Sequence, residues 1–320
     1  MTNKTKILIT GGYGFVGSHL IKKLDKYKKN LELICYDKLT YAASLKNLNS
    51  KKLVNKYRFY KQDICNFEKL YSVAKNCDYL INCAAESHVD KSFKSSITFL
   101  KTNIIGSRNI FECGRLSKKI KKIIQISTDE VYGENLGKPY KENSRLKPTN
   151  PYSASKASAE IVGRTFAQTF KVPLTIIRGN NLYGTNQYPE KIIPYVCYSL
   201  AKKKKIYLHG GGNVMRKFLH VEDFCDAIIK VLFNRKLIEE YNVGTKNKSI
   251  RISNLVKKIC FLLEKDYIKN IYTEYDRPFN DFRYSIDSTK IRSLGWYEKK
   301  LFNSELKKIC AHYYDKFSKL

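Results

Sequence analysis

The sequence has little that would suit a membrane, a zinc site or an oxidising compartment. No apolar run approaches the roughly 18 residues that are needed to span a bilayer. The nine cysteines are dispersed, with no C-x-x-C pair and no histidine spaced to complete a zinc site. Their odd number, and a polar start that leads straight into an apolar run, are typical of reduced thiols in a reducing compartment. We therefore expect a cytoplasmic protein that holds no metal and meets no membrane.

Acidic residues are also scarce, since 29 Asp and Glu face 60 Lys and Arg and leave a formal charge of +31 over 320 residues. Such a charge makes a polyanion a legitimate partner. The lysines, however, are scattered, and short runs such as Lys202 to Lys205 fall between apolar segments, where solvated turns or helix ends are expected. Because a nucleic-acid binder gathers its basic residues in one module, we expect no specific nucleic acid as partner. A field of this sign still favours an anionic substrate.

The first half of the chain alternates short apolar runs with longer stretches of helical character, as successive βαβ units do. The ranges Phe15–Lys26, Ile97–Cys113 and Ser153–Phe170 are predicted helices, each long enough to cover a face of a sheet. The pattern predicts an α/β fold with a doubly wound parallel sheet of the Rossmann type. The predicted strands are Lys6–Thr10, Leu33–Tyr36, Arg58–Lys61, Tyr79–Cys83, Ile123–Ser127 and Leu174–Arg178.

The character of the sequence changes after Arg178. The segments 179–194 and 210–216 are rich in Gly, Pro and Asn, which is typical of loops that close over a ligand. The range Phe218–Leu232 is predicted as a strand leading into a helix, and Tyr241–Val243 as a short strand that returns to the sheet. We expect a smaller, interleaved C-terminal substrate domain. The expected division is 1–178 with 218–246 for the dinucleotide-binding domain, and 179–217 with 247–320 for the substrate domain.

A glycine-rich turn follows the first predicted strand and begins the first predicted helix. Its glycines permit a tight turn and close approach of the backbone to a pyrophosphate at the helix N-terminus. Asp37 lies twenty residues beyond Gly17 at the end of the second strand, where a carboxylate binds the adenosine ribose and repels a 2′-phosphate. NAD is thus favoured over NADP, although the neighbouring Lys38 weakens that preference. The alternative interpretation is that the glycines are ordinary loop residues and that the acid only starts a turn. The expected contacts are Gly11, Gly12, Gly14, Phe15, Val16, Gly17, Asp37, Lys38, Asp63, Ile64, Cys83, Ala84 and Ala85.

Two pairs of residues have the spacing of catalytic groups. Tyr152 and Lys156 stand four residues apart at the start of a predicted helix, so their side chains project from one face. A nearby ammonium lowers the pKa of a tyrosine, and the phenol can then act as a general base toward an alcohol. Asp129 and Glu130 follow the fifth predicted strand, where open α/β sheets bind ligands, and an acid beside a carboxylate suits the removal of water. A solvated strand end or a helix cap is the alternative for this second pair.

The run STDEVYG from Ser127 resembles the signature of the nucleotide-sugar 4,6-dehydratases, a group of extended short-chain dehydrogenases. The PYSASKA run around Tyr152, DKLTY at Asp37, AAESHVD at Ala84, the stretch 181–194 and DRPFND at Asp276 extend the resemblance over essentially the whole chain. Epimerases of the same superfamily lack the Asp-Glu pair. The resemblance adds expected NAD contacts at Leu39, Thr40, Thr102, Tyr152 and Lys156.

The resemblance also implies a reaction in which the cofactor ends unchanged. Tyr152, helped by Thr128, would deprotonate the sugar C4 hydroxyl while NAD takes the C4 hydride, and the resulting ketone acidifies the C5 proton. Glu130 would remove that proton, and Asp129, kept protonated, would donate to the leaving C6 hydroxyl. The hydride would then return to C6, with Lys156 bound to the nicotinamide ribose. The implied enzyme is a hydro-lyase that converts a nucleoside-diphosphate glucose to its 4-keto-6-deoxy sugar.

The nucleotide of the substrate is inferred from two departures from the bacterial pattern. Phe279 and Asn280 stand where bacterial dTDP-glucose dehydratases usually carry Gly-His, and the run RGNNLYG from Arg178 has a different lead-in. Both features are more similar to the eukaryotic UDP-glucose 4,6-dehydratases, so UDP-glucose is favoured. The alternative dTDP-glucose stays open, because one methyl group is worth only about 1 to 3 kcal/mol to a pocket. The resemblance implies substrate contacts at Ser87, Thr128, Asn181, Glu190, Lys191, Arg216, Asn242, Arg277 and Asn280.

Two other functions and the oligomeric state remain to be considered. A nucleotide-sugar epimerase, and a non-catalytic Rossmann protein that binds polyanions, are the remaining alternatives. The complete set of catalytic residue types argues against both. The family commonly forms dimers through two helices of each subunit, for which 97–113 and 153–170 are the candidates here, and we expect a homodimer.

Overall fold

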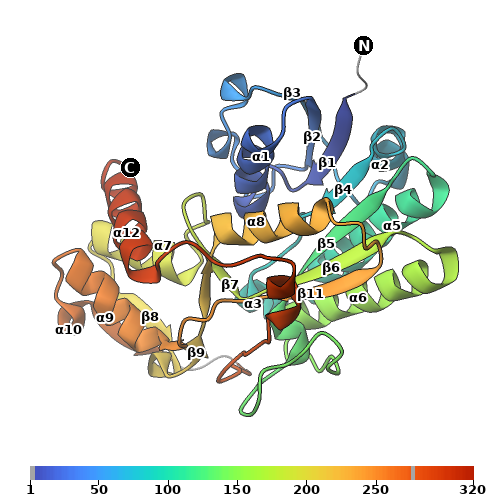
Figure 1. Cartoon of the computed structure of the whole chain (residues 1–320). Helices are drawn as coiled ribbons and strands as arrows, with labels where there is room; N and C mark the ends of the chain where they lie inside the picture. Colours follow the sequence, from blue (N-terminus) through green and yellow to red (C-terminus); the bar gives the residue numbers. More distant parts are fainter. Residues whose placement is uncertain (1–3, 275–277) are drawn as a thin grey trace.

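A seven-stranded parallel sheet forms the centre of the larger part of the molecule (Figure 1). The computed structural model describes residues 4–274 and 278–320. The strand order is β11-β6-β5-β4-β1-β2-β3, so the chain winds outward from β1 in both directions. This order confirms the predicted doubly wound Rossmann sheet. The strands are β1 (Thr5–Thr10), β2 (Leu31–Asp37), β3 (Lys56–Lys61), β4 (Tyr79–Asn82), β5 (Lys122–Thr128), β6 (Leu174–Gly179) and β11 (Glu239–Val243).

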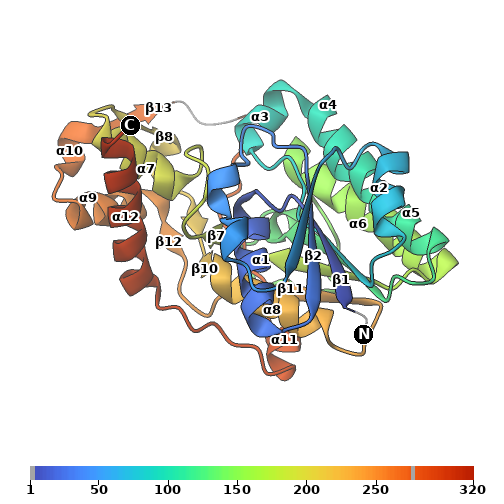
Figure 2. The ribbon, with the colours of Figure 1, turned by 90° about the horizontal axis from the view of Figure 1, so that it is seen from above.

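The central strands are buried on both faces, which explains why they are continuous apolar runs. Successive side chains of a strand point to opposite faces. Accordingly, Ile7 and Ile9 of β1 pack in one core and Leu8 packs in the other. The first core includes residues of helices α1 (Phe15–Tyr27) and α8 (Val221–Leu232). Figure 2 shows the helices of the second core on one side of the strands; they are α2 (Phe67–Ala74), α5 (Ser107–Leu116) and α6 (Pro151–Phe170).

The helix predicted over Ile97–Cys113 is not one continuous α-helix. It consists of α4 (Ser96–Phe99), a π-helical stretch η3 (Leu100–Gly106) and the start of α5. The π-helical turn brings Asn103 under the chain at Glu86, where its amide donates to the Glu86 carbonyl at 3.0 Å and its oxygen accepts from the Glu86 N–H at 2.9 Å. Wide turns of this kind are frequent beside functional sites, and periodicity alone does not reveal them.

Helix α6 begins two residues before its predicted start. Asn150 caps it, because its side-chain oxygen accepts from the Ser153 N–H at 2.9 Å, and Pro151 occupies the first helical position. Proline is favoured at this position, since its missing N–H would have no partner inside the helix. The cap therefore fixes the position of the backbone from which the Tyr152 side chain projects.

A third, smaller core lies apart from the two cores that flank the sheet. It is at one end of the molecule, where α7 (Ile192–Ala201), α9 (Ile252–Leu262) and α12 (Phe302–Ser318) gather (Figures 1 and 2). The predicted return of Tyr241–Val243 to the main sheet is confirmed, since β11 pairs with β6. The predicted strand and helix over Phe218–Leu232 are also confirmed. The described residues also form three two-stranded ribbons: β7 (Asn181–Tyr183) with β10 (Phe218–His220), β9 (Met215–Arg216) with β12 (Ile250–Arg251), and β8 (Ile206–His209) with β13 (Ile271–Glu274).

The remaining elements are short. Within the described residues, no helix is both long enough and apolar enough to cross a bilayer. The short helices are α3 (Val89–Lys94), α10 (Tyr267–Asn270), α11 (Thr289–Ser293), η1 (Leu45–Asn47), η2 (Ser50–Lys52), η4 (Asp129–Tyr132) and η5 (Gly210–Gly212).

Candidate active site

A cavity of about 350 Å³ opens at the carboxyl ends of the sheet strands, at the glycine-rich turn. A Cβ on Gly17 would lie 2.2 Å from the Gly11 carbonyl oxygen, and Gly11 itself has φ +64°, so both positions require glycine. Gly12 and Leu39 lie outside the lining; Gly12 packs on Cys35, and Leu39 binds Asp37 through its N–H. The other expected cofactor contacts all line the cavity: Gly11, Gly14, Phe15, Val16, Gly17, Asp37, Lys38, Thr40, Asp63, Ile64, Cys83, Ala84, Ala85, Thr102, Tyr152 and Lys156.

Asp37 is held at the end of β2 by backbone donors. Its two carboxylate oxygens accept from the Tyr13 N–H at 2.8 Å and the Leu39 N–H at 2.7 Å. Burial raises the pKa of Asp37, and these N–H bonds oppose the rise. The neighbouring Lys38 pairs with Asp63 at 2.7 Å, so a carboxylate already balances its charge. Lys38 therefore adds no unbalanced positive charge beside Asp37.

A second cavity of about 430 Å³ adjoins the first and extends toward the smaller core. The two cavities share part of their lining, and Glu130 is the one predicted proton carrier in the shared part of the described chain. Ser87, Glu130, Asn181, Glu190 and Lys191 line both cavities. Glu130, the predicted acceptor of the C5 proton, therefore lies where the first cavity meets the second.

Asp129 and Glu130 begin η4 directly after β5. The Thr128 hydroxyl caps this turn by accepting from the Glu130 N–H at 3.3 Å. Asp129 is only 3% exposed, and its carboxylate accepts from the Asn180 amide at 2.7 Å. Burial, with the charge of Glu130, raises the pKa of Asp129 to about 7 although Asn180 opposes the shift. Burial also raises the pKa of Glu130 against the charge of Arg216, so both carboxyls hold a proton more readily than exposed ones.

Tyr152 and Lys156 line the first cavity from α6, as predicted. The expected lowering of the Tyr152 pKa is wrong for this structure, because burial and the charges of Glu130 and Asp129 raise it. The Lys156 ammonium donates to the Ile126 carbonyl at 2.5 Å, and burial lowers the pKa of Lys156 to about 8. The two side chains share a helix face, but burial is the main cause of the raised pKa of Tyr152.

The second cavity is lined by several of the predicted substrate contacts. Arg216 is 8% exposed and stacks over Tyr284, with its guanidinium carbon 4.5 Å from the ring centroid. Its side chain donates to the Phe282 carbonyl at 3.1 Å and to the Asn280 side chain at 3.4 Å. Lys191 donates to the Ser87 carbonyl at 2.6 Å. The lining thus presents an oriented arginine fork and a lysine, which suit a diphosphate.

One predicted substrate contact, Asn242, lines neither cavity. Asn242 is fully buried, where it accepts from the Tyr132 hydroxyl at 2.9 Å and donates to the Tyr140 carbonyl at 3.0 Å. Its side chain is therefore used within the fold, and we leave it out of the candidate site. Arg277 lies outside the described residues.

Three polar residues of the site escaped the sequence analysis. Asn180 binds Asp129, as described above, and Asn150 donates to Glu130 at 3.4 Å. Ser127 lines the first cavity with a buried hydroxyl that has no hydrogen-bond partner among the described residues. The asparagine before Pro151 carries a cap signal that predicts its position, but nothing in the sequence indicates that it reaches Glu130. In the described chain, no three His, Cys, Asp or Glu side chains are grouped to hold a metal ion.

Known proteins with similar sequences are nucleotide-sugar dehydratases. A trifunctional UDP-glucose 4,6-dehydratase/UDP-4-keto-6-deoxy-D-glucose 3,5-epimerase/UDP-4-keto-L-rhamnose-reductase of Arabidopsis thaliana is 38% identical over 96% of this chain. The chain spans about half the length of that relative, 46%. A dTDP-D-glucose 4,6-dehydratase of Homo sapiens is 37% identical over 98% of this chain and 91% of its own length.

A solved structure repeats the whole architecture. The dTDP-glucose 4,6-dehydratase of Streptomyces venezuelae, crystallised with NAD bound, has a TM-score of 0.93 at 32% identity and covers 98% of this chain and 97% of its own. The model of the GDP-mannose 4,6 dehydratase family matches residues 8–309. These matches confirm the predicted kinship with the nucleotide-sugar 4,6-dehydratases, and the chain belongs to the GDP-mannose 4,6 dehydratase family.

Proposed function

We propose that this chain is an NAD-dependent hydro-lyase that converts a nucleoside-diphosphate glucose, UDP-glucose in the first place, to its 4-keto-6-deoxy sugar. The observation that carries the proposal is the position of Glu130 in the wall shared by the two cavities. A sugar bridging the cavities would have its C5 proton beside this carboxylate. Thr128 and Tyr152 line the cofactor side, where the C4 hydroxyl would be oxidised.

The residues divide the proton transfers between them. NAD, when bound, supplies an acceptor for the C4 hydride and returns that hydride to C6. Tyr152 takes the C4 hydroxyl proton as a phenolate, and because burial raises the Tyr152 pKa in this structure, the positive charge of a bound nicotinamide would have to lower it. Lys156 would bind the nicotinamide ribose from the same helix face. Glu130 removes the C5 proton once the ketone has acidified it, and it gives a proton back to C5 when the hydride is added at C6, which completes the 4-keto-6-deoxy sugar. Asp129, whose pKa burial raises to about 7, is protonated below neutral pH and donates to the leaving C6 hydroxyl.

The test is to incubate the purified protein with UDP-glucose, dTDP-glucose and GDP-mannose, each with and without added NAD. Mass spectrometry then follows the loss of one water from the sugar nucleotide. Loss from UDP-glucose supports both the reaction and the nucleotide. Loss from another sugar nucleotide alone keeps the reaction and changes the substrate, whereas C4 epimerisation without loss of water overturns the dehydratase proposal.

The preference for NAD over NADP is proposed from the charges beside the adenosine end of the first cavity. Asp37 lines this cavity as a buried carboxylate, and Asp63 balances Lys38. A 2′-phosphate would meet acids there. NAD should therefore protect the protein from thermal unfolding at lower concentration than NADP. Equal protection by the two cofactors would contradict the preference.

A homodimer is proposed from the outer faces of α4, η3, α5 and α6. Apolar side chains there are open to solvent in the single chain, which marks an interaction surface. A second copy fits this surface because α5 and α6 contact each other and present paired helices to a symmetric partner. Sedimentation of wild type and of Ile161→Lys would separate dimer from monomer. The exposed side chains are Ile97, Leu100, Ile105, Leu116, Ile161 and Phe170.

We also propose the division into a dinucleotide-binding and a substrate domain, and a reducing location for the protein. The two separate cores, one around α7, α9 and α12, support the division. All nine cysteines are free thiols, seven of them buried, which supports the location. Thiol labelling under native and unfolded conditions tests the second point, since a disulfide would leave fewer than nine reactive groups.

A further inference from the structure

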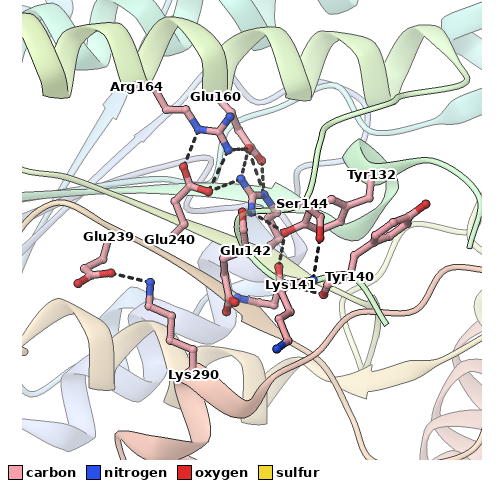
Figure 3. A network of polar contacts seen from close by, with 12 residues as sticks. Tyr132, Tyr140, Lys141, Glu142, Ser144, Glu160, Arg164, Glu239, Glu240 and Lys290 are labelled. Carbon is pink, nitrogen blue, oxygen red and sulfur yellow. Dashed lines mark hydrogen bonds and ion pairs between the residues drawn. The ribbon is translucent and has the colours of Figure 1, made fainter. Parts of the chain in front are cut away.

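The largest side chain that the fold buries completely is an arginine with no place in the proposed proton transfers. Arg178 is the penultimate residue of β6 and is 0% exposed. Its guanidinium binds Glu160 of α6 through two nitrogens, at 3.0 and 2.6 Å, and Glu240 of β11 at 2.6 Å. Figure 3 shows these carboxylates converging with Arg164, which closes the network on the outside of α6. Two arginines and two glutamates balance in charge here.

The remaining donor of Arg178 is directed at the catalytic turn, by which we mean η4 (Asp129–Tyr132). It donates to the Tyr132 hydroxyl at 2.5 Å and also to the Glu142 carbonyl at 3.1 Å, and the guanidinium carbon lies 4.9 Å from the centre of the Tyr132 ring. Tyr132 in turn donates to Asn242 of β11, so the hydroxyl has a partner on each side. Tyr132 stands two residues after Glu130 on the same short helical turn, so Arg178 is bound to the segment that carries this carboxylate.

The same guanidinium reaches the helix that carries the proposed base. Glu160 lies four residues after Lys156 and eight after Tyr152, so the three project from one side of α6. Burial lowers the pKa of Lys156, and the negative charge of Glu160 partly opposes this lowering. One fully buried side chain is therefore bound at once to the catalytic turn and to the Tyr152 helix.

We propose that Arg178 is a positioning residue, which clamps Tyr132 of the catalytic turn to Glu160 of α6. The clamp sets the distance between two groups that act on neighbouring carbons of one sugar, the Tyr152 hydroxyl and the Glu130 carboxylate. This inference rests on the proposed dehydration. An error of about 1 Å in such a distance can slow a reaction about a hundredfold, so the clamp acts on rate rather than on substrate binding.

The variant that isolates the clamp is Tyr132→Phe. It removes the hydroxyl that joins Arg178 to the turn, while the ion pairs of Arg178 with Glu160 and Glu240 stay closed, so the fold keeps its buried charges paired. The matched control is Arg164→Met, which removes a cation from the same network but touches neither the turn nor the cavities.

We expect Tyr132→Phe to lower kcat about tenfold or more, with KM changed by less than about twofold. Oxidation at C4 depends on Thr128 and Tyr152 and is less affected than elimination. The bound cofactor should therefore accumulate in its reduced form during turnover, seen by its near-ultraviolet absorbance. The isotope effect on kcat from deuterium at C5 should rise above that of wild type.

A purely structural role predicts a different outcome. Tyr132→Phe would then lower the Tm as Arg164→Met does, with kcat, cofactor absorbance and isotope effect all as in wild type, and the proposal would be overturned. If wild type forms no product from any of the sugar nucleotides, the proposed function fails, and the clamp is judged by amide hydrogen exchange alone. Faster exchange over 129–133 in Tyr132→Phe than in Arg164→Met supports the clamp, and equal exchange overturns it.

Discussion

Two pairs of carboxylates, Asp129 with Glu130 and Glu160 with Glu240, differ in the partners that surround them. Asp129 is bound by the neutral amide of Asn180, and its pKa is raised to about 7. Burial also acts on Glu240, but hydrogen bonds and charges from Arg164 and Arg178 hold the pKa of Glu240 below its ordinary value. Burial alone thus does not decide whether a carboxyl can carry a proton. A guanidinium bound directly to the carboxylate, as on Glu240, does, whereas the charge of Arg216 only opposes the rise in the pKa values of Asp129 and Glu130.

Removing the central cation should have the largest effect. Arg178→Met leaves the fully buried Glu160 and the half-buried Glu240 with Arg164 as their remaining ion-pair partner in the described chain, and breaking a buried pair costs about 3 to 5 kcal/mol of folding free energy. Urea unfolding monitored by circular dichroism measures the difference. Glu160→Gln, which removes charge from the other side, is the second variant should Arg178→Met not fold. A loss below about 1 kcal/mol in both variants would show that the pairing stabilises little.

The reactive pair should respond in catalysis rather than in folding. Glu130→Gln removes the proposed acceptor of the C5 proton, and we expect kcat to fall about a hundredfold, equal to nearly 3 kcal/mol. Oxidation at C4 is spared, so reduced cofactor should appear in a single burst after substrate is added. Glu305→Gln on α12, which only loses its contact with Lys308, is the matched control. Normal turnover by Glu130→Gln would remove Glu130 from the mechanism.

The unpaired acid should destabilise the fold in a pH-dependent way. The folded-state pKa of Asp129 lies above the ordinary value, so the folded protein binds this proton more tightly than the unfolded chain. Stability therefore falls as the pH rises toward about 7, and the full penalty is present above that. Asp129→Asn should gain on the order of 2 kcal/mol at about pH 8 and less at about pH 5. A gain that does not change with pH would contradict the assignment.

The outer member of the paired group should have the smallest effect. Arg164 is 34% exposed and shares both glutamates with Arg178. Arg164→Met should cost about 1 kcal/mol or less, because water replaces part of the lost interaction and Arg178 remains. The unfolding free energies of Arg164→Met and Arg178→Met, measured side by side, sharpen the contrast. Equal losses of unfolding free energy would show that burial of the cation does not decide how much its ion pairs stabilise the fold.

Sequence reasoning located the residues of the site better than it described their environment. Sixteen of the eighteen expected cofactor contacts line the first cavity, because strand ends and glycine turns are local features. The assignment of Asn242 to the substrate failed for a tertiary reason, since Tyr132 and Tyr140 use its side chain. The predicted lowering of the Tyr152 pKa was wrong because the direction depends first on burial and then on two acids more than twenty residues away in sequence. The π-helical turn of η3 is likewise set by a contact with Glu86 and not by its own residues.

The amino-acid sequence by itself determined the parallel sheet, the glycine turn with Asp37, and the order of the catalytic residue types. These follow from periodicity, turn chemistry and spacing, which act between near neighbours in the chain. Only the tertiary structure decided which buried carboxylates meet a guanidinium. Arg178, Glu160 and Glu240 come from three separate elements, and they are brought together by the pairing of β11 with β6 and the packing of α6. The charge of a buried acid depends on such partners, and for this reason the proton carriers of the site could be named from the sequence but not assigned their pKa values.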